Sequence, residues 1–152
     1  MAGNFQRREW LIQRAGWLAI ALAILAGAAG VFGDGPLADV RLEGNGIRLE
    51  YERFARMEAP NEWRLTVLDT PAGGRLEIGV DASLVSNYRF TEIHPEPRQV
   101  RAAGARWVYE FVVEGRNAPI VFHAQALHAG RYRGDLRIGA SPPVRLSQYI
   151  YP

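Results

Sequence analysis

The sequence predicts an all-β domain preceded by one N-terminal transmembrane helix. Its 152 residues are enough for one domain of ordinary size. One long apolar run lies near the N-terminus, between Ala15 and Phe32. After this run, short segments alternate apolar and polar residues with a period of two, and turn-forming residues separate them about every eight to twelve residues. The first pattern indicates a membrane span, and the second indicates antiparallel β-strands.

The apolar run of residues 15–32 is predicted to be the transmembrane helix. Its eighteen residues, AGWLAIALAILAGAAGVF, include no charged side chain. At about 1.5 Å per residue they form about 27 Å of helix, which nearly spans the hydrocarbon core of a bilayer. Turn-forming residues from Gly33 to Pro36 then end the helix, so residues 33–37 are expected to be a linker.

The residues around the run predict its orientation and its anchoring. Three arginines lie in residues 1–14, whereas the fifteen residues after the run contain only Arg41. By the positive-inside rule, residues 1–14 are a basic cytoplasmic segment and residues 38–152 lie in the periplasm or outside the cell. The absence of Lys and the bias toward Ala, Gly and Arg suggest a bacterial protein from a GC-rich coding background. With the predicted helix and its orientation, the expected location is the bacterial inner membrane. Five side chains are expected to anchor the helix in the lipid bilayer: Arg7, Arg8, Trp10, Arg14 and Trp17.

Two other interpretations of the apolar run stay open. Ala26-Gly27-Ala28 matches the small-x-small pattern of a cleavage site, so the run also fits a cleaved signal peptide. The apolar residues continue past that site to Phe32, which favours an uncleaved anchor. A buried helix of a soluble protein would need apolar partners on every side, more than the rest of the chain is expected to supply.

Small residues recur along one stripe of the predicted helix. Ala15, Ala19, Ala23 and Gly27 follow one another at four-residue spacing, and Ala26 with Gly30 makes a second such pair. Small side chains on one stripe allow a second membrane helix to approach closely. The stripe therefore predicts packing against another integral membrane protein, although an Ala-rich segment also produces such spacings by chance.

The rest of the chain is predicted to form a β-sandwich. The expected strands cover residues 38–42, 47–54, 62–68, 75–81, 88–93, 100–102, 107–113, 120–126, 132–138 and 144–151. The turn Gly44-Asn45-Gly46 joins the first two strands into a hairpin, and residues 69–74 are expected to join the next two in the same way. Asp81 is expected to cap a short helical turn over residues 81–85. Strands at this spacing are typical of an antiparallel immunoglobulin-like β-sandwich, with a small barrel as the alternative.

Composition excludes several classes of function. The chain has no Cys, which removes disulfides and thiolate metal sites, and no Lys, which removes Schiff-base chemistry. After residue 14 the charges balance at fifteen Arg and fifteen Asp plus Glu, interspersed along the sequence. This balance predicts a mixed, neutral surface and no nucleic-acid partner.

No arrangement of residues predicts catalysis or a cofactor. His94, His123 and His128 are the three imidazoles. His123 and His128 are five residues apart, a spacing that fits neither a helical nor a strand-face ligand pair. No serine lies in a G-x-S-x-G turn. We therefore expect a non-enzymatic protein without a metal or another cofactor.

Two segments are candidate contacts with a partner. Pro95 and Pro97 stiffen the segment His94-Pro95-Glu96-Pro97, which would lose little entropy on binding. Tyr149 and Tyr151 place large side chains at the C-terminus, where chain ends are usually polar. The alternatives are an ordinary loop for the first segment and completion of the core for the second.

Two functions follow from these features. The first is a single-pass membrane protein whose sandwich serves as an accessory or structural subunit of a membrane protein complex. The second is a secreted or anchored ligand-binding module for a metal, a small molecule or an envelope polymer. It predicts a concave pocket lined by Trp63, Trp107 or the histidines.

Overall fold

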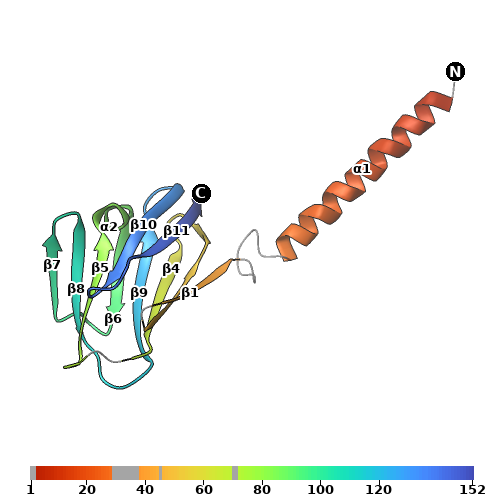
Figure 1. Cartoon of the computed structure of the whole chain (residues 1–152). Coiled ribbons are helices and arrows are strands. Elements are labelled where there is room, and N and C mark those ends of the chain that lie inside the picture. Colours follow the sequence, from red (N-terminus) through yellow and green to blue (C-terminus); the bar gives the residue numbers. More distant parts are fainter. Residues whose placement is uncertain (1–2, 29–37, 45, 70–71) are drawn as a thin grey trace. The chain divides into compact units, whose positions relative to one another are not determined.

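The chain forms two compact units, residues 1–38 and residues 39–152. A computed structural model describes residues 3–28, 38–44, 46–69 and 72–152, with side chains from Trp10 onward. The first unit is the helix α1 (Gly3–Ala28), and the second is built from β-strands (Figure 1).

Helix α1 begins twelve residues before the predicted start at Ala15. Residues 4–15 contain no Gly or Pro and are rich in good helix formers such as Gln, Arg and Leu, so helix extends through the basic segment. The predicted end of the helix after Ala28, including Gly30, and the linker lie outside the described residues.

The second unit is mostly β, as predicted, and its strands form two sheets. The strands are β1 (Asp39–Gly44), β2 (Ile47–Glu52), β3 (Phe54–Arg56), β4 (Pro60–Val67), β5 (Arg75–Asp81), β6 (Tyr88–His94), β7 (Gln99–Ala103), β8 (Arg106–Val112), β9 (Ala118–Ala126), β10 (Gly130–Ile138) and β11 (Val144–Tyr151). In the described residues, one sheet has five strands in the order β1-β2-β4-β9-β6, and the other has six in the order β3-β11-β10-β5-β8-β7. Neighbours are antiparallel except β3 and β11, which run parallel.

The two sheets enclose the core between them. Along β4, Trp63, Leu65 and Val67 are buried while the residues between them face outward, and β5 repeats the pattern from Leu76 to Val80. This alternation is the period-two pattern of the sequence, now placed on two sheets whose inner faces pack together.

The predicted hairpin of residues 62–68 and 75–81 is wrong. β4 pairs with β2 and β9 in the five-stranded sheet, and β5 pairs with β8 and β10 in the six-stranded sheet. Two consecutive strands that each have one apolar face can pair side by side in one sheet or face each other from two packed sheets. Here the connection between β4 and β5 crosses from one sheet to the other. The hairpin of β1 and β2 is confirmed.

The predicted strand of residues 47–54 is divided in two at Arg53. β2 belongs to the five-stranded sheet, whereas β3 pairs with β11 in the other sheet. The backbone carbonyl of Arg53 accepts a hydrogen bond of 2.8 Å from the Tyr149 N–H, which brings the chain to the second sheet.

The short helix after β5 forms, but its cap differs from the prediction. Helix α2 (Ala82–Asn87) follows Asp81, which makes no side-chain capping hydrogen bond. The Asp81 carboxylate instead accepts the Asp135 N–H at 2.8 Å and lies 3.3 Å from the Arg106 Nε. Asp81 therefore ties β10 and β8 to the end of β5.

Candidate functional site

The most apolar exposed surface of the described chain is the helix α1. Residues Trp10–Ala28 form a segment of nineteen residues with a mean hydropathy of 1.7, and none of it is buried. Its large apolar side chains are each more than half exposed: Trp10, Leu11, Ile12, Trp17, Leu18, Ile20, Leu22, Ile24 and Leu25. The segment is long and apolar enough to cross a bilayer, and a signal sequence has the same properties.

The residues predicted to anchor the helix all lie in α1. The Arg14 guanidinium carbon lies 4.3 Å from the ring centroid of Trp10, a cation–π contact one helical turn apart. Trp17 is exposed on the same helix. The side chains of Arg7 and Arg8 fall outside the described part of the chain.

Four residues of the predicted small-residue stripe lie in α1. Ala15, Ala19, Ala23 and Gly27 all lie within the helix, where four-residue spacing places them on one side. The described residues contain no helix that packs against this stripe, so the prediction of a membrane partner stays a prediction.

The segment predicted to contact a partner begins at the end of a strand. His94 is the last residue of β6, and Pro95, Glu96 and Pro97 follow it outside any strand. The His94 Nε2 lies 2.6 Å from the Glu92 Oε1, and both side chains are well exposed.

The fold brings together two histidines that the sequence keeps apart. The rings of His94 and His123 lie edge to face with centroids 6.3 Å apart, because β6 and β9 are neighbours. Both lie on the outer face, His94 because a β-bulge between Phe90 and Glu92 shifts the alternation of β6, and only the strand pairing brings the two rings together. Among the described residues, no three His, Asp or Glu side chains lie close enough to hold a metal ion.

Trp63 does not line a pocket, contrary to the prediction made for a ligand-binding module. It is fully buried, and its ring packs edge to face on Tyr88 at 4.9 Å and on Phe90 at 5.6 Å. Trp107 is 39% exposed, near the edge of the six-stranded sheet.

A polar network lies beside Trp63 in the core. The Tyr88 hydroxyl donates to the Gln148 Oε1 at 2.6 Å, and the Gln148 Nε2 donates to the Glu52 carbonyl at 2.8 Å. Burial raises the pKa of Tyr88 well above its ordinary value, so this hydroxyl keeps its proton. The network joins strands of both sheets and has a structural role.

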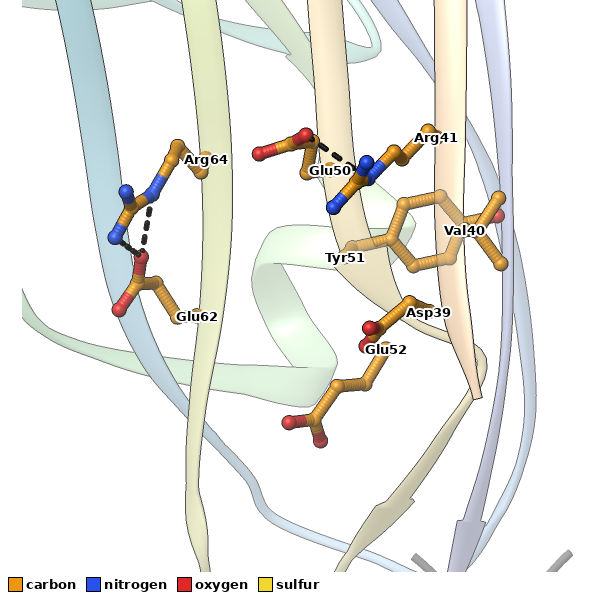
Figure 2. Close-up of a pocket in the computed structure, with 8 residues that line it drawn as sticks. All are labelled: Asp39, Val40, Arg41, Glu50, Tyr51, Glu52, Glu62 and Arg64. Atoms are coloured by element: carbon orange, nitrogen blue, oxygen red, sulfur yellow. Dashed lines mark hydrogen bonds and ion pairs between the residues drawn. The ribbon is translucent and has the colours of Figure 1, made fainter. Parts of the chain in front are cut away.

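An open hollow of about 360 Å³ lies on the outer face of β1, β2 and β4 (Figure 2). Arg41 reaches Glu50 at 3.1 Å, and Arg64 folds back on Glu62 at 2.7 Å. The hydrogen bond from Arg64 to Glu62 raises the pKa of the guanidinium, which therefore stays charged. The hollow is a charged surface whose arginines are engaged by carboxylates.

A second groove, of about 570 Å³, lies where β1 approaches β11 and β3. Apolar and aromatic side chains line it, and three arginines surround them: Val40, Leu42, Tyr51, Phe54 and Tyr149, with Arg53, Arg131 and Arg145. The Tyr51 hydroxyl donates to the Ser147 carbonyl at 3.4 Å and accepts from the Ser147 N–H at 3.3 Å. This groove combines positive charge with exposed aromatic surface.

Tyr149, one of the predicted partner contacts, is 50% exposed in this groove. It lies on the outer face of β11 with Arg131 of β10 on one side and Phe54 of β3 on the other. Tyr151 follows on the same face and is half-buried.

The outer faces of the two sheets carry opposite charge. In the strands of the six-stranded sheet, eight arginines and four carboxylates point outward, a net charge of +4; the residues are Arg56, Arg75, Arg101, Arg106, Arg131, Arg133, Arg137 and Arg145, with Glu77, Asp81, Glu110 and Asp135. In the five-stranded sheet, four arginines and six carboxylates point outward, a net charge of −2; the residues are Arg41, Arg48, Arg64 and Arg89, with Asp39, Glu43, Glu50, Glu52, Glu62 and Glu92. The fold therefore distributes the charges unevenly between the two faces, although positive and negative charges are equal in number after residue 14.

Comparison of the chain with protein-family models and with curated proteins finds no match.

Proposed function

We propose that this chain is a single-pass protein of a bacterial inner membrane, anchored by α1, with residues 1–14 in the cytoplasm. The observation that carries the proposal is the exposure of every large apolar side chain described in α1. Such a surface is stable in a lipid bilayer and costly in water.

Outside the membrane, the β-unit would act as a non-enzymatic accessory or structural subunit of a membrane protein complex. The small-residue stripe of α1 supports a helical partner, because small residues let two membrane helices come into close contact. The burial of Trp63 weakens the alternative of a pocket for a small molecule built around that residue.

We also propose that the β-unit is immunoglobulin-like. That fold places strands A, B, E and D in one sheet and strands C, F and G in the other. The run β2-β4-β9-β6 fits the first order and the run β5-β10-β11 fits the second. In this assignment, β7 and β8 form a hairpin inserted between strands D and E.

The test is purification of the full chain from native membranes in a mild detergent, with intact mass and identification of the proteins that accompany it. We expect a chain of 16.9 kDa together with a stoichiometric integral membrane protein. A chain about 3 kDa lighter in the soluble envelope fraction would show a cleaved signal peptide and refute the anchor.

Substitutions on the stripe test the helical partner. Ala23→Leu and Gly27→Leu should each lower the yield of the accompanying protein, because Leu keeps the backbones apart. Leu22→Ala, which shortens an exposed side chain of the same helix, is the matched control. Equal yields from all four chains, wild type included, would refute packing through the stripe.

A further inference from the structure

We call the outer face of the six-stranded sheet the basic face and the outer face of the five-stranded sheet the acidic face. The carboxylates of the basic face do not balance its positive charge. Among its eight outward arginines, three form ion pairs in the described structure: Arg101 with Glu77, Arg106 with Asp81, and Arg145 with Asp135. The Arg145 pair is loose, at 3.7 Å, and the arginine side chain is 81% exposed. On β10 and β11, an anionic surface could therefore approach Arg131, Arg133 and Arg145 without breaking a close ion pair.

Exposed aromatic side chains lie among these arginines. Tyr149 has Arg131 as its cross-strand neighbour on one side and Phe54 on the other. Arg53 and Arg145 line the same groove of about 570 Å³. Tyr beside Arg is typical of surfaces at the headgroup level of a bilayer, where aromatic rings and guanidinium groups find both apolar and anionic partners.

We propose that the basic face docks on the anionic headgroups of the membrane that holds α1, with the groove around Tyr149 receiving lipid phosphates. This inference rests on the membrane anchoring proposed above. Ten residues separate Ala28 from Asp39, so covalent geometry keeps the start of β1 within about 40 Å of the end of α1. That tether raises the effective concentration of anionic lipid near the face, and charge complementarity selects the basic face over the acidic one.

The experiment uses the full chain in nanodiscs of phosphatidylcholine with or without phosphatidylglycerol. Because the chain has no Cys, a single introduced Cys gives one labelling site. Val112→Cys places a fluorophore on the basic face, and Thr66→Cys places one on the acidic face. Energy transfer from each label to an acceptor lipid reports which face lies near the bilayer.

We expect phosphatidylglycerol to increase energy transfer from the Val112→Cys label and not from the Thr66→Cys label. Arg131→Ala and Arg145→Ala should each lower the ratio of docked to undocked chains by roughly fivefold. Arg41→Ala and Arg48→Ala, on the acidic face, are the matched controls and should not lower it. High salt should remove the response, because it screens exposed charges.

Transfer from the Val112→Cys label that does not respond to phosphatidylglycerol would overturn the inference, and an acidic protein would then be the next partner to test. A chain that fails to enter nanodiscs would contradict the membrane anchoring itself. The two failures are therefore distinguishable.

Discussion

The Tyr88 hydroxyl is a polar group in the core, and its hydrogen-bond partner there is the side chain of Gln148. The Tyr88 hydroxyl of the five-stranded sheet donates to Gln148 of the six-stranded sheet, and Gln148 donates back across the core to the Glu52 carbonyl. We expect Tyr88→Phe to destabilise the β-unit by about 1–3 kcal/mol at neutral pH, because the Gln148 Oε1 loses its donor. Urea denaturation measures the change, with Tyr149→Phe, at a half-exposed site, as the control.

The same residue predicts a dependence on pH. Burial raises the pKa of Tyr88 in the folded protein above the ordinary value of 10.0. The unfolded chain therefore ionises first, so the contribution of Tyr88 to stability is full below pH 10 and falls as the pH rises above it. The stability difference between wild type and Tyr88→Phe should shrink between about pH 8 and about pH 11. A difference that stays constant over this range would contradict the burial of this hydroxyl.

Helix α2 packs on β10 through a close contact between Leu84 and Gly134. Leu84 is fully buried, and a Cβ built on Gly134 would overlap its Cγ and Cδ1. We expect Gly134→Ala to destabilise the β-unit by about 1–3 kcal/mol, because a buried leucine in a packed core has little room to move. Thermal unfolding provides the measurement.

Gly79 in β5 offers a matched control for this substitution. Its Cβ would meet side-chain and backbone atoms of Arg106 and Arg137 at 3.6 Å or more, which is ordinary contact. Gly79→Ala should therefore cost clearly less than Gly134→Ala. Equal losses would indicate that alanine is unfavourable in these strands for reasons other than the contact with Leu84.

The elements themselves were largely predictable from the sequence, but their pairing was not. Alternation correctly places Trp63 and Ile78 on inner faces, since a strand with one buried face must have a period of two. The same pattern is compatible with pairing inside one sheet or packing across two sheets. For this reason β4 and β5 were expected to form a hairpin, and the contact between His94 and His123 was not foreseen.

The charge separation appears only in the whole molecule. Summing charges along the chain gives neutrality after residue 14, because the +4 of the basic face is offset by the −2 of the acidic face and by a net −2 on residues that belong to neither face. The pattern can be seen in β10, where every second residue points outward. Arg131, Arg133 and Arg137 are among these outward residues, with Asp135 between them. Counting charges separately for the inward and outward residues, once the buried residues of each strand are known, would have found the basic face.

The two units of the molecule should also differ in what truncation of a leucine to alanine costs. Leu65 is fully buried in the core of the β-unit, so Leu65→Ala should destabilise that unit by about 2–5 kcal/mol. Leu22 lies in α1 and takes no part in that core, so Leu22→Ala should leave the stability of the β-unit unchanged.

Hydrogen exchange of peptides from β4 and β9, in the detergent-solubilised full chain across a urea series, reads the stability of the β-unit alone. The same chemical change is thus compared in the two units of one chain. A loss of protection in β9 with Leu22→Ala would mean that α1 supports the sandwich. The apolar surface of α1 would then serve the fold as well as the membrane, and its exposure would no longer argue for a bilayer.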